Sequence, residues 1–127
     1  MSDRILVIDD DEAIRKSFTL ALEDTPYQVD TAESGKKGIG MAQNNKYDLI
    51  FLDLKMPGLN GVETLRELRK IEKDVPVYIV TAFHKEFFDE LQAVVEDGID
   101  FELLKKPIGN DEIVLVAKAA LEGLTAY

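Results

Sequence analysis

Cysteine is absent from this chain of 127 residues. Its absence excludes disulfides, thiol catalysis and zinc sites with cysteine ligands. Long apolar runs are absent too, since none approaches the ~20 residues that a membrane-spanning helix needs. The amino-terminal MSDRILVIDD lacks the pattern of a signal peptide, because charges interrupt it and no long apolar region follows. We therefore expect a soluble, cytoplasmic protein that does not bind a membrane.

Basic side chains are outnumbered, with 15 Lys and Arg against 25 Asp and Glu, a formal net charge of -10 and a pI of about 4.5. An acidic chain is repelled by phosphate backbones, so we expect no nucleic acid binding by this chain. The content of 46% hydrophobic and 31% charged residues is typical of a globular protein with a solvated surface. The length predicts one domain over residues 1–127.

Apolar, β-branched runs alternate with helical patterns along the chain. Strands are predicted at 4–8, 27–32, 48–53, 75–82 and 101–105. Helices are predicted to follow the capping residues Asp11, Ser34 and Asn60, and to span 87–96 and 110–124. The helix after Ser34 has the lowest expected propensity because it contains three glycines. In the last helix, the predicted inner stripe consists of Ile113, Ala117, Ala120 and Leu124.

Five β–α units of this kind predict an α/β fold with a parallel sheet covered on both faces. We expect a doubly wound five-stranded sheet in the order 2-1-3-4-5, a flavodoxin-like fold. In such sheets, ligand sites form outside the carboxyl ends of the strands, where the strand order reverses. For this order, that place lies between the first and third strands.

Chemically active side chains follow four of the predicted strands. They are Asp9, Asp10 and Asp11 after the first, Asp53 at the end of the third, Thr81 near the end of the fourth and Lys106 after the fifth. Clustered carboxylates repel each other unless protons or a cation offset their charge. Oxygen ligands with no Cys or His among them favour Mg²⁺ or a similar ion. With the ammonium and the hydroxyl opposite, the site looks built to hold a phosphoryl group in transfer.

The segments ILVIDDDE, DLIFLDLKMPGLNG, VYIVTA and LLKKP closely resemble the receiver domains of bacterial two-component response regulators. The resemblance covers essentially the whole chain, and DLKMPGLNG is its most specific part. It implies a receiver fold and a phosphorylation switch that accepts a phosphoryl group from a sensor histidine kinase. Such a protein catalyses only its own phosphorylation and dephosphorylation.

The resemblance also implies a role for each site residue. Asp53 would be the phospho-acceptor, and Mg²⁺ would bind Asp9, Asp10, Asp53 and the backbone carbonyl of Lys55. Thr81 would bond a phosphoryl oxygen and report phosphorylation. Lys106 would pair with the phosphoryl group, and the peptide bond before Pro107 would be cis.

Two features depart from the family pattern. The aromatic residue that many members carry three positions before the motif lysine is replaced by Leu103, and the nearest aromatic residue is Phe101. The stretch from Thr81 to Lys106 is a few residues longer than is common.

Phe87 and Phe88 point ~100° apart on a helix, so at least one should miss the core. With Phe101 they could form an apolar patch on the fourth-helix, fifth-strand, fifth-helix face, where family members bind a second copy or an output partner.

Two positions bear on the lifetime of the phosphorylated state. Lys55 and Phe83, each two residues after a site residue, should flank the approach of the attacking water. Lysine has no acceptor and phenylalanine has no polar group, so neither can take a proton from that water. We expect slow autodephosphorylation.

His84, the single histidine, is predicted to be a surface loop residue and not a phosphohistidine.

Two other function classes remain open. Asp9-x-Asp11 after a strand resembles the first motif of haloacid-dehalogenase-type phosphatases, although Ala13 stands where that family has Thr or Val. Phosphorylation of Asp9 in place of Asp53 would indicate such an enzyme. A binding module with a receiver fold and no reaction is the other class. Failure to bind Mg²⁺ or to react with acetyl phosphate would favour it.

Overall fold

The chain forms one parallel sheet of five strands in the order β2-β1-β3-β4-β5, as predicted. The computed structural model describes residues 3–82 and 85–123. The strands are β1 (Arg4–Ile8), β2 (Gln28–Ala32), β3 (Leu49–Asp53), β4 (Val77–Thr81) and β5 (Glu102–Lys105). The helices are α1 (Glu12–Ala21), α2 (Gly35–Asn44), α3 (Gly61–Ile71), α4 (Phe88–Glu96) and α5 (Asn110–Glu122), with a short 3-10 turn, η1 (Lys85–Phe87), before α4.

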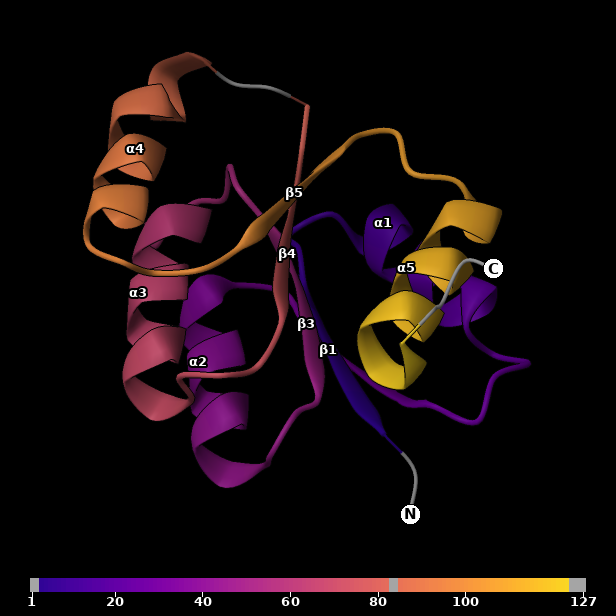
Figure 1. Cartoon of the computed structure of the whole chain (residues 1–127). Coiled ribbons are helices and arrows are strands. Elements are labelled where there is room, and N and C mark those ends of the chain that lie inside the picture. Colours follow the sequence, from indigo (N-terminus) through magenta and orange to yellow (C-terminus); the bar gives the residue numbers. More distant parts are fainter. Residues whose placement is uncertain (1–2, 83–84, 124–127) are drawn as a thin grey trace.

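Helices cover both faces of the sheet (Figure 1). Side chains alternate along each strand, so Leu6 and Ile8 of β1 pack into the core beneath α2, α3 and α4. Ile5 and Val7 pack into the second core, beneath α1 and α5. The rings of Phe18 from α1 and Phe51 from β3 lie 4.8 Å apart in that second core. Two apolar cores thus hold the strand ends rigidly in place.

Each of the three predicted capping residues begins a helix. The Asp11 side chain accepts a hydrogen bond from the backbone N–H of Ala13, and Ser34 accepts one from Lys37. Asn60 forms a reciprocal capping box with Glu63 at the start of α3. These contacts satisfy N–H groups that have no partner inside the helix. The helix starts next to the candidate site are therefore encoded locally.

One glycine of α2, Gly38, has a tertiary explanation. A Cβ atom at Gly38 would lie 2.4 Å from Cδ1 of Ile8, too close for any side chain without movement of the β1 core. The glycine lowers helix propensity, but it lets α2 pack directly against β1. The helix predicted to be the weakest therefore forms over its full length.

β1 has the limits that were predicted, and the limits of the other four strands differ from the predicted ones by one or two residues. β2 to β5 are all shorter than expected, and β5 is largely exposed at the edge of the sheet. Phe87 belongs to η1, so α4 begins at Phe88. Phe87 is buried and Phe88 is 57% exposed, as their adjacency predicted. Leu124, predicted for the inner stripe of α5, lies outside the described residues.

No helix within residues 3–82 and 85–123 is long and apolar enough to cross a lipid bilayer.

Candidate functional site

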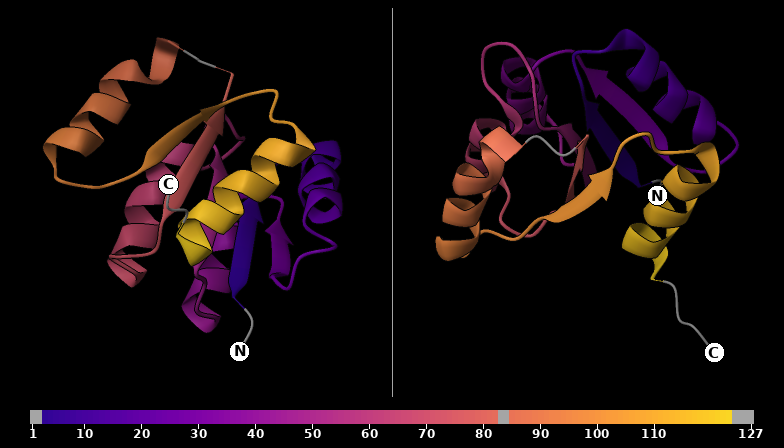
Figure 2. Two further views of the ribbon diagram at one scale, coloured as in Figure 1. Left: turned by 45° about the vertical axis from the view of Figure 1, so that its right-hand side comes forward. Right: turned by 90° about the horizontal axis from the view of Figure 1, so that it is seen from above.

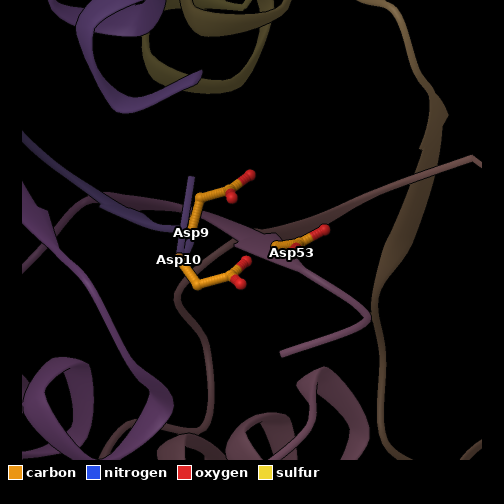
Figure 3. A group of neighbouring side chains, drawn as sticks. All are labelled: Asp9, Asp10 and Asp53. Carbon is orange, nitrogen blue, oxygen red and sulfur yellow. The ribbon is translucent and has the colours of Figure 1, made fainter. Parts of the chain in front are cut away.

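Three carboxylates meet where β1 and β3 end, at the reversal of strand order. Asp9 and Asp10 follow β1, and Asp53 is the last residue of β3. One carboxylate oxygen from each lies within 4.8 Å of the others. Figure 3 shows the three carboxyl groups directed to the same side of the sheet edge. Asp9 and Asp53 are buried, whereas Asp10 is exposed. The predicted carboxylate cluster is therefore present in the fold.

Lys106 joins two of these carboxylates across the site. Its Nζ lies 2.9 Å from Oδ1 of Asp53 and 3.2 Å from Oδ2 of Asp9. The peptide bond between Lys106 and Pro107 is cis, as expected. The backbone N–H of Lys106 donates to the carbonyl of Thr81 at 2.8 Å, which holds the start of this loop against β4. Lys106, and not its neighbour Lys105, thus reaches the cluster.

Burial controls the protonation of the site. Burial raises the pKa of Asp53 to about 6, and the nearby charges of Asp9 and Asp10 add to the rise, against the lowering effect of Lys106. Burial also raises the pKa of Asp9, although a hydrogen bond from the Asp11 backbone and the charge of Lys106 oppose it. For Lys106, burial favours the neutral amine, but the contacts with Asp53 and Asp9 outweigh this effect and raise its pKa. The ammonium therefore stays charged and stabilises ionised carboxylates.

The donor set suits a hard divalent cation. All three groups are carboxylates, and three negative charges against one ammonium leave a formal charge of -2. Mg²⁺ prefers oxygen ligands, is usually bound by one or two carboxylates and keeps several waters. Asp10, exposed beside the buried pair, leaves the cluster open to solvent on one side. The residues present fit Mg²⁺ on chemical grounds.

Asp11 has a different task from Asp9 and Asp10. Its carboxylate caps α1 by accepting from the Ala13 N–H at 2.9 Å, and the side chain is exposed. If Asp9-x-Asp11 were a phosphatase motif, both of its aspartates should face the reacting group. A capping Asp11 does not offer that arrangement, so the geometry does not favour the phosphatase reading.

Thr81 and Lys55 are near the carboxylates in the sequence and the sheet, since Thr81 ends β4, the strand beside β3, and Lys55 follows Asp53 by two residues. Thr81 is buried at the end of β4, and Asp53 is paired in register with its neighbour Val80. The Lys55 side chain is exposed and forms an ion pair with Glu86, with 3.4 Å between Nζ and Oε1. Phe83 and His84, for which we predicted a place near the water path and a surface position, lie outside the described residues.

Two further residues support the cluster, of which Arg15 was not assigned from the sequence and Gly61 was interpreted as a residue that backbone geometry requires. Arg15 donates from Nη1 to the backbone carbonyl of Asp9 at 2.8 Å. Its place one turn into α1 is the available signal, because helical side chains point back toward the N-terminus. Gly61 brings the start of α3 against the strand end: a Cβ there would lie 2.5 Å from the carbonyl oxygen of Asp53. Its N–H donates to the carbonyl of Leu54 at 2.7 Å.

Comparison with known proteins identifies the family. Residues 5–118 match the family model described as the response regulator receiver domain. This chain belongs to that family. It is 36% identical over 121 residues to the response regulator MprA of Mycobacterium sp. strain KMS, a match that covers 95% of this chain and 51% of the relative. The MprA of Mycobacterium tuberculosis strain ATCC 25177 / H37Ra is equally similar, at 36% over 121 residues, with 95% and 51% covered.

Solved receivers share the fold. A CheY-like receiver domain protein from Methanospirillum hungatei JF-1 superposes with a TM-score of 0.85 at 26% identity, covering 96% of this chain and 95% of that one. The chemotaxis response regulator CheY4 of Vibrio cholerae superposes with a TM-score of 0.81 at 27% identity, covering 95% and 100%. The chain spans about half the length of the curated relatives it matches. It is thus a receiver domain, consistent with phosphorylation-dependent two-component signalling.

The departure from the common receiver pattern lies on β5 and just before it. Leu103 is 45% exposed. Phe101 is half-buried against the core formed with α3 and α4, just before β5 begins. The two positions therefore have different surroundings, and Phe101 occupies a packed place far from the end of β5 that carries the site.

Proposed function

We propose that this receiver accepts a phosphoryl group from a sensor histidine kinase onto Asp53, with Mg²⁺ bound by Asp9, Asp10, Asp53 and the carbonyl of Lys55. It acts as a cytoplasmic switch over residues 1–127 and catalyses only its own phosphorylation and dephosphorylation. The observation that carries the proposal is Lys106, whose ammonium lies between the buried carboxylates of Asp53 and Asp9. A cation already placed there can pair with a phosphoryl oxygen.

The transfer needs little covalent chemistry from the protein. An Oδ of Asp53 attacks phosphorus while the bond from phosphorus to the kinase histidine nitrogen breaks, and the nitrogen keeps the electron pair. Mg²⁺ held by Asp9, Asp10 and Asp53 would supply positive charge that offsets the charge of the phosphoryl oxygens. Lys106 pairs with another of these oxygens, and the Thr81 hydroxyl donates to a third. Arg15 and Gly61 hold the backbone of Asp9 and Asp53 in place.

The raised pKa of Asp53 sets a condition on this reaction. Only the ionised carboxylate is a nucleophile, and a pKa of about 6 leaves most of it ionised at neutral pH. A cation held by these carboxylates would favour the ionised form further. Mg²⁺ binding and nucleophile activation are thus coupled in the proposed mechanism.

Mass spectrometry after incubation with acetyl phosphate and Mg²⁺ tests the assignment. We expect one added phosphoryl group on the parent protein and none on Asp53→Asn. The exposed Asp24→Asn serves as the matched control and should be labelled like the parent. Peptide mapping then locates the group. Undiminished labelling of Asp53→Asn overturns the proposal, and a phosphoryl group mapped to Asp9 would indicate the phosphatase class.

The proposed readout is a change in the face formed by α4, β5 and α5. The exposed Phe88 and Leu103 lie on it. We propose that phosphorylation alters what this face binds, either an output partner or a second copy of the chain.

A further inference from the structure

A cavity of about 330 Å³ lies between the carboxyl-terminal ends of α2 and α3. These two helix ends lie side by side at the lower end of the sheet in Figure 1 and in the left view of Figure 2. Each helix leads into the next strand, so the cavity is at the amino ends of the strands, whereas Asp9 and Asp53 are at the carboxyl ends. Ligand pockets in proteins commonly have volumes of ~300–1,000 Å³. The cavity is thus large enough for a small molecule and is separate from the carboxylate cluster.

The inner wall of this cavity is apolar. It is formed by four buried residues of the core beneath α2 and α3: Tyr47, Ile50, Leu68 and Val75. The Tyr47 hydroxyl donates to Oδ2 of Asp30 at 2.7 Å and is therefore already in use. Ile71 lines the cavity too, and its side chain is 38% exposed. A ligand with an apolar body would cover Ile71 and remove its surface from water, which is favourable.

The end of α2 places hydrogen-bond acceptors at the rim. Residues 42–44 line the cavity and form the end of this helix, where carbonyl groups have no partner inside the helix. The side chains of Asn44 and Asn45 donate to the carbonyls of Gly40 and Met41, each at 3.0 Å. Among the residues that the structure describes, no hydrogen bond reaches the carbonyls of residues 42–44. The last turn of α2 contains no basic side chain that could offset their negative charge.

Glu72 adds a carboxylate to the same rim. It is the C-cap residue of α3, lines the cavity and is partly buried. Arg69 uses its guanidinium on the carbonyls of Val75 and Asp100, at 2.6 and 2.7 Å. Lys46, the basic residue of the lining, is exposed, and within 3–82 and 85–123 no ion pair joins any cation to Glu72. A partly buried carboxylate without a paired cation is unfavourable, so a ligand that brings a cation is favoured.

The rim and the inner wall together define the chemistry of the ligand. An ammonium group has three donors and no acceptor, which matches carbonyl groups and a carboxylate. An anionic head group would meet Glu72 and the negative end of the α2 dipole. The net charge of -10 acts in the same direction, since it attracts cations and repels anions.

We propose that this cavity binds a small amphiphilic amine, with its apolar body against Tyr47 and Ile71 and its ammonium group at Glu72 and the end of α2. The site is distinct from the carboxylate cluster, and binding does not require phosphorylation of Asp53. Ile50, in the inner wall, belongs to β3. The ligand would therefore contact the strand that ends in Asp53.

Three probes of similar size test this chemistry: phenethylamine, phenethyl alcohol and hydrocinnamate. They share a phenyl ring on a short chain and carry a cationic, a neutral and an anionic head group. Binding is measured by titration with amide and methyl NMR shifts, in excess Mg²⁺ to compete for the carboxylate cluster. We expect shifts centred on Ala42, Ile71 and Val75. The amine should bind most tightly and hydrocinnamate about tenfold more weakly.

Glu72→Gln removes the charge at the rim and keeps the size of the side chain. Its matched control is Glu23→Gln, which makes the same change in net charge at an exposed position outside the cavity. We expect Glu72→Gln to weaken binding of phenethylamine about fivefold and to leave phenethyl alcohol unchanged, whereas Glu23→Gln stays within about twofold of the parent for both probes.

Ala42→Leu tests the cavity itself, because the larger side chain occupies part of its volume. We expect it to weaken binding of the amine and of the alcohol alike. Should Ala42→Leu not fold, Ile71→Ala takes its place, since it removes an exposed wall of the cavity and should also weaken both probes.

Equal effects of Glu72→Gln and Glu23→Gln would mean that the amine responds to net charge alone, and the inference would be overturned. Hydrocinnamate that binds as tightly as the amine would contradict the proposed head group. Shifts centred on the carboxylate cluster, or no saturable binding of phenethylamine to the parent protein, would contradict the site.

Discussion

At the scale of single residues, three consecutive aspartates have separate tasks. Asp9 is buried beside Lys106, Asp10 is exposed in the carboxylate cluster, and Asp11 caps α1. Each task follows from where the chain turns after β1. The same type of side chain thus serves as a buried charge, an exposed member of the carboxylate cluster or a helix cap, according to its neighbours.

This division predicts different effects for Asp10→Ala and Asp11→Ala. Asp10→Ala should weaken Mg²⁺ binding and slow phosphorylation, because one of few carboxylate ligands is lost. Asp11→Ala should leave Mg²⁺ affinity nearly unchanged and lower the free energy of unfolding by about 1 kcal/mol through the lost cap. Calorimetric Mg²⁺ titration and urea unfolding measure the two effects. Equal losses of affinity would mean that the metal ligands are misassigned.

The pKa of Asp53 predicts a pH dependence of stability in the absence of Mg²⁺. The folded-state pKa of about 6 lies above the ordinary value of 3.8, so the folded state binds this proton more tightly than the unfolded state. Its stabilising contribution is therefore full below pH ~4 and is lost as the pH rises through ~6. Urea midpoints measured in EDTA should fall for the parent relative to Asp53→Asn across this range. A constant difference between the two proteins would contradict the raised pKa.

At the scale of elements, an ion pair joins the segments that follow β3 and β4. Lys55 follows β3 and pairs with Glu86 of η1. The pair is exposed, so it contributes little to stability. Its position matters more for hydrolysis of phosphorylated Asp53. Two residues after Asp53 it places an ammonium group, which cannot accept a hydrogen bond from water.

We expect these loops to control the lifetime of phosphorylated Asp53. Lys55→Asn combined with Phe83→Glu should speed hydrolysis, because Asn and Glu can accept a hydrogen bond from the attacking water. The argument for Phe83 rests on its position two residues after Thr81. Loss of phosphoprotein after removal of the donor, at equal Mg²⁺, measures the rate. Lys70→Asn on the exposed surface of α3 is the control. A double variant that decays no faster than the parent would show that these side chains do not govern water access.

At the scale of the whole molecule, the net charge of -10 opposes the compact state by self-repulsion. The three carboxylates of the site concentrate part of that charge at one edge of the sheet. Lys106 offsets only one of the three charges. A divalent cation bound at the cluster should therefore stabilise the fold as a whole.

Mg²⁺ should raise the urea midpoint of unfolding of the parent protein. At a concentration a hundredfold above its Kd, a ligand that binds only the folded state adds ~2.7 kcal/mol. Asp10→Ala should show a much smaller rise at the same concentration. Sodium chloride at matched ionic strength is the control, since general screening also stabilises an acidic protein. If sodium chloride reproduces the whole effect, Mg²⁺ acts by screening and not by binding at the cluster.

The sequence by itself determined the order of the elements, the three side-chain caps and the chemistry at the strand ends. These depend on local periodicity, on single capping residues and on the rule that parallel strands end at one edge. The exact strand limits depend on pairing with neighbours. For example, Val75 belongs to the apolar run that predicted the fourth strand, but it lies outside β4. Its carbonyl accepts a hydrogen bond from the Arg69 side chain at 2.6 Å.

Only the tertiary structure decided how the site is assembled. Lys106 and Asp9 are 97 positions apart, and their contact exists because the fold brings both strand ends together. The raised pKa of Asp53 and the fit of Gly38 against Ile8 likewise need atoms that are distant in sequence. Burial and electrostatic coupling are properties of surroundings that no local pattern encodes.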